Sequence, residues 1–267
     1  MYNVLTTKGT KAKAIESLPK QFSESIRSDL IKRAVAAIEA NNRQPYGANP
    51  RAGFHSSADY RGRRRGYGCW INKGMHRTKR IRIGSGGLAG TVRIVPHSVK
   101  GRKAHPPKAQ KVWSKKLNNN ERKKAIRSAI AGTKEIQYVL GRGHIIDEKM
   151  QLPLIVDTLE NIRKTKELND FLSSIGLENE VQKVKIKKVR AGRGKMRGRK
   201  YKTKTGPLLI YGDEKTDAKT LNSLQGIEAV NVRNLNAKLL SPGAHNIRLC
   251  IWSQNALKIL EEEELFY

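Results

Sequence analysis

Positive charge in this chain is concentrated in two stretches that carry almost no acidic residues. Residues 43–116 contain 19 Lys and Arg against one acid, Asp59, and residues 183–204 contain 12 Lys and Arg and no acid. The other 171 positions hold 23 basic and 22 acidic residues, so nearly all of the net charge of +31 belongs to these two stretches. Charge separated in this way needs a polyanion, and a long flexible cationic segment is typical of nucleic-acid binding.

The nearly neutral 171 residues are enough for one ordinary hydrophobic core. The sequence has no run of about 18 apolar residues, and its first residues lack the apolar core of a signal peptide. Only Cys69 and Cys250 occur, and two isolated thiols argue against a disulfide framework and against a structural zinc site. We therefore expect a cytoplasmic protein without a membrane span or a metal.

Short apolar strands alternate with short helices in the nearly neutral part. The expected strands are 2–6, 207–212, 227–232 and 247–252, and 152–159 is a further short apolar run. The expected helices run from Ser23 or Ser25 to about Ala40, from Asn119 or Asn120 to about Ala131 with Gly132 as C-cap, and over about 161–172, 217–224, 234–240 and the residues that Ser253 caps. Residues 178–189 fit a helix or a strand, and we favour the helix. This alternation predicts an α/β fold with a parallel sheet.

The first basic stretch leaves one expected helix and returns into another, so it is predicted to be an insertion. It contains 11 Gly and shows no sustained helical or strand period. Such a segment cannot offset its ordering entropy by burying apolar surface, and we expect it to be disordered in isolation. Its 74 residues far exceed a usual connection, and loops of that length are functional or disordered.

The residue types of the two basic stretches favour RNA as the partner. Arg dominates over Lys between residues 51 and 82, and 190–200 (RAGRGKMRGRK) again combines Arg with Gly. Arg binds phosphate through two parallel hydrogen bonds and stacks on bases, and aromatic side chains stack on unpaired bases. The interleaved aromatic residues of the first stretch are Tyr46, Phe54, Tyr60, Tyr67, Trp70 and Trp113.

Motifs for catalysis or for a cofactor are weak or missing. Residues 84–89 (GSGGLA) match a dinucleotide fingerprint, but they lack the flanking strand and helix and the acid about 20 residues later. We interpret them as a flexible glycine hinge. None of the six His residues has a partner at metal-ligand or catalytic spacing. The sequence therefore predicts no cofactor, no metal, no catalytic residues and no enzymatic activity.

Five blocks of sequence carry a family resemblance. They are RQPYGANPRAG (43–53), GRKAHPPKAQK (101–111), ERKKAIRSAIAGT (121–133), RAGRGKMRGRKYKTKTGPLLIY (190–211) and VRNLNAKLLSPGAHNIRLCIWSQNALKIL (232–260). Together they resemble the L-four family of large-subunit ribosomal proteins, in its archaeal and eukaryotic branch. The resemblance follows the order of the chain over almost its whole length, and residues 60 to about 98 depart most from the family pattern.

The resemblance implies an α/β/α globular domain of three layers with a central, mostly parallel sheet, formed by residues 1–42 and 117–267. It implies a structural, non-enzymatic role in the cytoplasmic large ribosomal subunit, including support of its assembly. Residues 43–116 would be an extended loop that threads through ribosomal RNA to the wall of the nascent-peptide exit tunnel, and 183–204 a second RNA contact. The implied partners are large-subunit ribosomal RNA, neighbouring ribosomal proteins and the nascent peptide. No membrane and no homo-oligomer is expected.

The candidate RNA-binding residues are the cations of both stretches with selected aromatic and His residues. We expect Arg to contact phosphate and stack on bases, Lys to add point charge, and Tyr67 and Trp70 to stack on splayed bases. The loop tip is expected between about Arg61 and Arg80. The full set is Arg43, Arg51, Arg61, Arg63, Arg64, Arg65, Tyr67, Trp70, Lys73, His76, Arg77, Lys79, Arg80, Arg82, Arg93, Arg102, Lys103, His105, Lys108, Arg190, Arg193, Lys195, Arg197, Arg199 and Lys200.

Two other readings of the same basic segments stay open at this point. One is a free-standing RNA chaperone or RNA-processing factor, which would wash off large subunits in moderately high salt. The other is an RNA-modifying enzyme, which the missing cofactor fingerprint disfavours.

Overall fold

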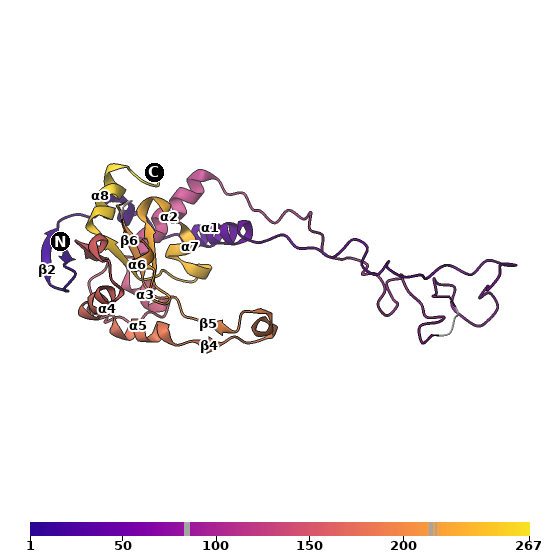
Figure 1. The fold of residues 1–267 in the computed structure, drawn as a ribbon. Helices are drawn as coiled ribbons and strands as arrows, with labels where there is room; N and C mark the ends of the chain where they lie inside the picture. The colour runs from indigo at the N-terminus through magenta and orange to yellow at the C-terminus, as the bar shows by residue number, and fades with distance from the viewer. Residues whose placement is uncertain (83–85, 214–215, 217) are drawn as a thin grey trace. The chain divides into compact units, whose positions relative to one another are not determined.

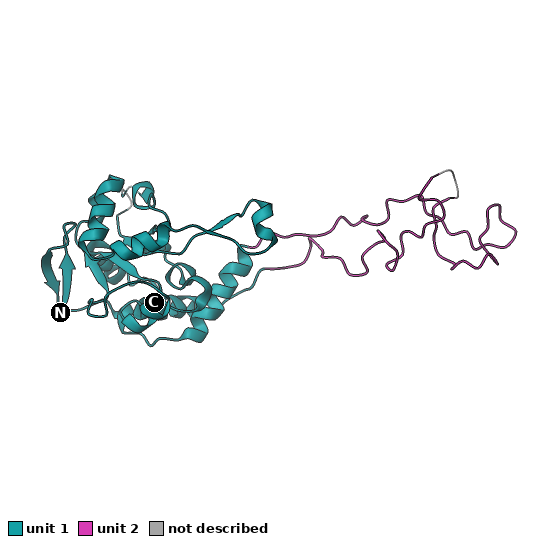
Figure 2. Ribbon diagram, turned by 90° about the horizontal axis from the view of Figure 1, so that it is seen from below, with its two compact units in different colours: residues 1–42, 114–267 teal, residues 43–113 magenta. Residues whose placement is uncertain are grey.

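A computed structural model describes residues 1–82, 86–213, 216 and 218–267 (Figure 1). The described residues form two compact units (Figure 2): unit 1 is residues 1–42 with 114–267, and unit 2 is residues 43–113. The start of the predicted helix 217–224 and the first residues of the glycine motif 84–89 lie outside the described residues.

Unit 1 contains every helix and strand of two or more residues in the described chain. The strands are β1 (Tyr2–Leu5), β2 (Lys11–Ile15), β3 (Leu154–Val156), β4 (Lys188–Val189), β5 (Tyr201–Lys202), β6 (Leu208–Tyr211), β7 (Glu228–Asn231) and β8 (Cys250–Ser253). The α-helices are α1 (Ser28–Asn41), α2 (Asn119–Gly132), α3 (Ile136–Gly141), α4 (Thr165–Ser174), α5 (Glu178–Lys185), α6 (Ala218–Leu221), α7 (Ala237–Leu240) and α8 (Gln254–Glu262). Short 3-10 helices cover Lys20–Ser23, Leu159–Asn161, Arg193–Arg197, Val232–Asn234 and Pro242–Ala244.

Six strands form one sheet in the order β2-β1-β3-β8-β6-β7. All neighbours in it are parallel except β1 and β2. The central strand β8 pairs on both sides, so Trp252 lies opposite Ile155 of β3 and Ile210 of β6. The predicted α/β fold with a mostly parallel central sheet is confirmed.

Alternation along the central strands divides the core into two layers. Ile155, Ile210 and Trp252 face one cluster, which also contains apolar residues of α1, α2, α7 and α8. Val156, Leu209 and Ile251 face the other cluster, with apolar residues of α3, α4, α5 and α6. Strand side chains point alternately to opposite faces, so a strand buried on both sides is a continuous apolar run. The result is a sheet between two helix layers (Figure 1).

Strand β2 and the β4–β5 hairpin were not predicted. Strand β2 (KAKAI) continues from β1 through a turn in which the Thr6 amide donates to the Thr10 carbonyl at 2.8 Å. Its side chains are largely exposed because it forms an edge of the sheet, so it lacks the apolar pattern of a buried strand. Residues 178–189 proved to contain both alternatives, since α5 ends at Lys185 and β4 follows at Lys188.

Several predicted helix ends were wrong. Neither Ser23 nor Ser25 caps α1, which begins at Ser28, and the amide of Arg27 donates across to the Ser128 hydroxyl at 2.5 Å. Gly132 is the last residue of α2 rather than its cap, and Thr133 follows in a helical conformation. Tertiary contacts between α1 and α2 therefore replace the expected local cap. The helices predicted over 161–172, 217–224 and 234–240 are Thr165–Ser174, Ala218–Leu221 and Ala237–Leu240.

Unit 2 is irregular chain over its described residues, 43–82 and 86–113. Its ladder contacts are isolated bridges that join Arg80 to Asp59 and to Val92. The two ends of the segment run beside each other, and the Ala48 amide donates to the Pro107 carbonyl at 2.9 Å. A Cβ on Gly47 would lie 2.4 Å from the Ala109 nitrogen, so glycine permits this close approach.

Candidate nucleic-acid interface

Unit 2 presents most of its predicted RNA-binding cations to solvent. Only one acid, Asp59, occurs between residues 43 and 116, so little of this charge is neutralised within the segment. An irregular segment with few buried apolar residues places most side chains outward. The exposed predicted residues of unit 2 are Arg43, Arg51, Arg63, Arg64, Arg65, Tyr67, Lys73, His76, Arg77, Lys79, Arg82, Lys103, His105 and Lys108.

Four of the predicted arginines are only half-exposed: Arg61, Arg80, Arg93 and Arg102. The guanidinium of Arg80 donates to the Gly90 carbonyl at 2.9 Å and to the His76 carbonyl at 3.2 Å. Arg93 donates to the Val99 carbonyl. These guanidinium groups tie the chain of unit 2 together, so fewer of their N–H groups are left for phosphate in this conformation.

The two predicted stacking residues differ in how the structure presents them. Tyr67 is fully exposed, with a relative accessibility of 103%, whereas Trp70 is 8% exposed. The amide of Trp70 donates to the Arg61 carbonyl at 2.9 Å. Lys73 Nζ lies 5.9 Å from the centre of the Trp70 ring. Tyr67 is therefore ready to stack on a base in this conformation, and Trp70 is packed inside unit 2.

A cation–aromatic cluster joins the two ends of unit 2. The rings of Tyr46 and Trp113 stack with centroids 5.6 Å apart, and the guanidinium carbon of Arg43 lies 3.9 Å from the Trp113 ring centre. Lys111 Nζ lies 4.5 Å from the same ring. Sequence reasoning identified Arg43 but missed the cluster, because its members lie at opposite ends of a long segment and no local pattern connects them.

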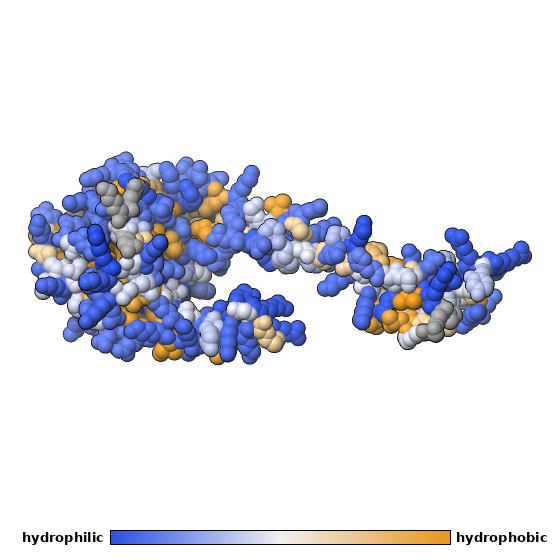
Figure 3. Space-filling view, in the orientation of Figure 1, coloured by the Kyte–Doolittle hydropathy of each residue, from blue (hydrophilic) through white to orange (hydrophobic). Residues whose placement is uncertain are grey.

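Most of the second basic stretch lies in an arm, residues 186–205, that contains β4, β5 and the 3-10 helix Arg193–Arg197. Predicted residues Arg193, Lys195, Arg197, Arg199 and Lys200 are exposed there. Arg190 is half-exposed, and its Nε donates to the Arg199 carbonyl at 3.1 Å. Figure 3 shows a mainly hydrophilic surface over this arm. The arm is thus a second dense group of outward-facing cations.

The carboxylate of Glu160 lies at the carboxyl ends of the central strands β6 and β8. Glu160 Oε1 accepts hydrogen bonds from the Gly212 amide at 2.8 Å and the Ser253 hydroxyl at 2.8 Å. Its Oε2 accepts from the Asn255 amide group at 3.3 Å. In open α/β sheets, ligands bind at this edge. Here Glu160 satisfies donors from the ends of β6 and β8 and uses its charge for structure.

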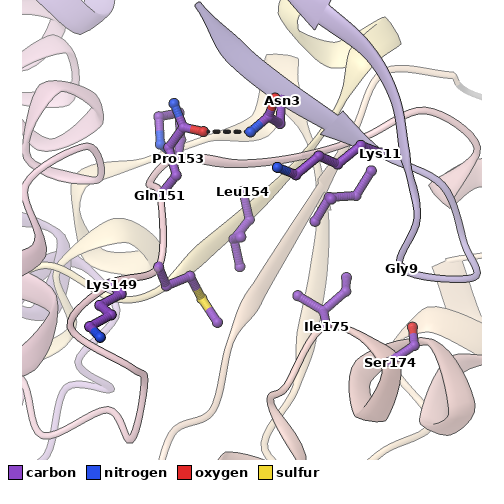
Figure 4. Close-up of a pocket in the computed structure, with 11 residues that line it drawn as sticks. Asn3, Gly9, Lys11, Lys149, Gln151, Pro153, Leu154, Ser174 and Ile175 are labelled. Carbon is purple, nitrogen blue, oxygen red and sulfur yellow. Dashed lines mark hydrogen bonds between the residues drawn. The ribbon is translucent and has the colours of Figure 1, made fainter.

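A hollow of about 380 Å³ lies between β1, β2 and the chain around Pro153 (Figure 4). Asn3 Nδ2 donates to Gln151 Oε1 across it at 2.9 Å. Its described lining carries the ammonium groups of Lys11 and Lys149 but no His, Cys or carboxylate side chain.

Metal-ligating side chains do not gather in the described part of the chain, where no three His, Cys, Asp or Glu residues form a group that suits an ion. Nor does any described helix combine the length and the apolar character needed to cross a membrane. The exposed cations of unit 2 and of the arm form the candidate interface.

Comparison with known proteins gives one consistent family. The family described as "Ribosomal protein L4/L1 family" matches residues 15–263. A large ribosomal subunit protein uL4 from Nanoarchaeum equitans is 46% identical over 253 residues, which is 94% of each chain. Proteins of the same name from Archaeoglobus fulgidus and Methanopyrus kandleri are 40% and 37% identical, each over 97% of both chains.

Proposed function

Because the chain belongs to the ribosomal protein L4/L1 family, we propose that this structural constituent of the large ribosomal subunit binds large-subunit ribosomal RNA through unit 2 and the arm. The observation that carries the proposal is the unbalanced charge of these segments, 17 cations against one acid in unit 2 (43–113) and 10 against none in the arm (186–205). Most of these cations are exposed. Lys and Arg that neutralise phosphates release condensed counterions, and this release drives binding.

The long segment 43–116 is proposed as an inserted loop that folds onto RNA during assembly. In support, its described residues have few buried apolar side chains, of which Ala58 and Trp70 are the most buried. Such a segment gains its order from the partner that neutralises it. We assign its tip, between about Arg61 and Arg80, to the wall of the nascent-peptide exit tunnel, where it meets the nascent peptide. The α/β domain anchors the loop, beside neighbouring ribosomal proteins.

The same proposal includes a non-enzymatic, cytoplasmic protein that binds no cofactor and forms no homo-oligomer. Family membership supports the non-enzymatic role, because the matched relatives are named as large ribosomal subunit proteins.

The test compares the full chain with a variant that lacks residues 58–98. Affinity for large-subunit ribosomal RNA is measured from 50 to 300 mM salt, and circular dichroism reports folding. We expect a folded variant with weaker binding and a shallower salt dependence, since each lost phosphate contact removes roughly 0.7–0.9 from the logarithmic slope. Lys166→Gln, an exposed residue of α4, is the control and should bind like the full chain.

Two results would contradict the proposal. An unchanged affinity and slope would mean that residues 58–98 make no RNA contact. An unfolded deletion variant would mean that the segment belongs to the core of unit 1.

A further inference from the structure

Two lysines oppose each other across the short ladder of the arm. Strands β4 and β5 pair antiparallel, and Lys188 lies directly opposite Lys202. Side chains at such positions project from the same face with Cβ atoms roughly 4.5–5.5 Å apart, and like charges there are destabilising. A ladder of two residues per strand offers little to offset this repulsion. The arrangement therefore favours an anion between the two ammonium groups.

These lysines line a hollow of about 460 Å³ at the base of the arm. Arg142, which follows α3, and Lys204 contribute two further cations to its lining, and Thr203 and Thr205 contribute hydroxyl groups. None of the described lining residues carries a carboxylate. The hollow thus brings together residues from two distant parts of unit 1, which no local sequence motif connects.

The floor of the hollow is neutralised internally, and its rim is not. Lys183, with a side chain 10% exposed, pairs with Glu180 and donates to the Gly143 carbonyl at 2.8 Å. Glu180 also accepts from the Ile145 amide at 2.8 Å and contacts His144 Nδ1 at 2.7 Å, so its two oxygens are fully used. Over the described chain, the side chains of Arg142, Lys188, Lys202 and Lys204 form no ion pair. Four cations without an ion-pair partner therefore line the hollow beside the Lys183–Glu180 pair.

We propose that this hollow binds a backbone phosphate of ribosomal RNA, an inference that rests on the proposed function and adds a site to it. A phosphodiester fits the chemistry, since Lys supplies point charge, Arg supplies a fork for two phosphate oxygens, and Thr hydroxyls donate hydrogen bonds. The exposed cations of Arg193–Lys200 continue the charge along the same arm, which matches an anion that repeats along a strand. Lys188, Lys202 and Lys204 belong to the second basic stretch expected to contact RNA, although none is in the named residue set, and Arg142 lies outside that stretch.

The first experiment compares Lys188→Gln/Lys202→Gln with Lys185→Gln/Lys187→Gln in the full chain. Both pairs remove two charges near the base of the arm, but Lys185 and Lys187 do not line the hollow. Without RNA, the first variant should melt at or above the wild-type temperature because the opposed charges are gone. With ribosomal RNA, we expect it to lose roughly 0.7–0.9 from the logarithmic salt slope, the share of one phosphate contact, and to bind more weakly than the control. Equal losses in the two variants would overturn the proposal.

The second experiment follows chemical labelling of the lysines in wild-type protein, read by mass spectrometry. We expect ribosomal RNA to protect Lys188 and Lys202 and to leave Lys166 reactive. If RNA binds but Lys188 and Lys202 are labelled as fast as Lys166, the phosphate site is wrong while the proposed function stands. If RNA does not bind, the proposed function itself fails.

Two competing anions identify the source of the phosphate. Full protection by inorganic phosphate alone, at the same ionic strength, would overturn the RNA assignment in favour of a free phosphate site. Protection by polyglutamate equal to that by RNA would overturn it in favour of an acidic protein segment. Protection that requires RNA supports the proposal.

Discussion

Burial decides the protonation of His144, on the floor of the hollow. Desolvation lowers the pKa of this imidazole from its ordinary value of 6.5, and the charges of Lys183 and Arg248 act in the same direction, against the contact with Glu180. Burial alone would raise the pKa of Glu180, but hydrogen bonds from His144, the Ile145 amide and Lys183 lower it on balance. The pair therefore holds a neutral imidazole beside an ionised carboxylate.

A His with a lowered pKa makes stability depend on pH. Between 6.5 and the lower folded value, the unfolded chain binds more protons at this site, so the free energy of unfolding falls as the pH falls. We expect His144→Gln to lose less stability than wild type between pH 7.5 and 5.5, measured by urea unfolding. The difference can reach about 1.4 kcal/mol for each pH unit that separates the folded and unfolded pKa of the imidazole.

His245→Gln, at an exposed position, is the control and should keep the wild-type dependence of stability on pH. A wild-type drop in His144→Gln would exclude this residue as the cause.

At the scale of elements, a local cap was predicted correctly only where the cap is also tied into the core. The Ser253 hydroxyl accepts from the Ala256 amide at 3.0 Å at the start of α8 and donates to Glu160 at 2.8 Å. Ser23 and Ser25 have the same cap-forming side chain, but α1 begins later, where the Arg27 amide meets Ser128 of α2. Helix packing, and not a local serine cap, therefore sets where α1 begins.

Removing the α8 cap should destabilise unit 1. We expect Ser253→Ala to lower the free energy of unfolding by about 1–2 kcal/mol, because one buried helix N–H loses its acceptor. Ser25→Ala removes the same hydroxyl at an exposed position that caps no helix, and it should change stability by less than about 0.5 kcal/mol. Urea unfolding followed by circular dichroism measures both, and equal effects would refute the role of Ser253.

At the scale of the whole molecule, apolar burial is divided as unequally as charge. Both core clusters consist of residues from unit 1. In unit 2, Ala58 and Trp70 are the buried apolar residues among those described. Local opening costs little where few apolar contacts are broken, so the two units should differ in stability when RNA is absent.

Limited proteolysis tests this difference. A protease of broad specificity should cut the free protein first within residues 43–113 and leave unit 1 resistant. Binding to large-subunit ribosomal RNA should slow cleavage in 43–113, while a fragment of unrelated RNA at the same concentration, in high salt, serves as control. Equal resistance of both units in the free protein would contradict the expected disorder.

The sequence by itself determined the fold class and the partition of charge. A strand such as β8 (Cys250–Ser253), buried on both faces, must be a continuous apolar run, and the alternation of such runs with short helices indicates a parallel sheet. The five blocks that resemble the family, taken in their order along the chain, were also enough to identify the family. Both signals are local or cumulative along the chain, so no knowledge of contacts was needed.

Many side chains of this chain are of the same type, and only the tertiary structure decided the surroundings of each one. It placed Trp70 inside unit 2 and Tyr67 outside, turned the Arg80 guanidinium toward carbonyl groups, and set Lys188 opposite Lys202 beside Arg142. It also paired the exposed edge strand β2 with β1. These outcomes depend on contacts between residues far apart in the chain or on strand register, and neither composition nor periodicity contains that information.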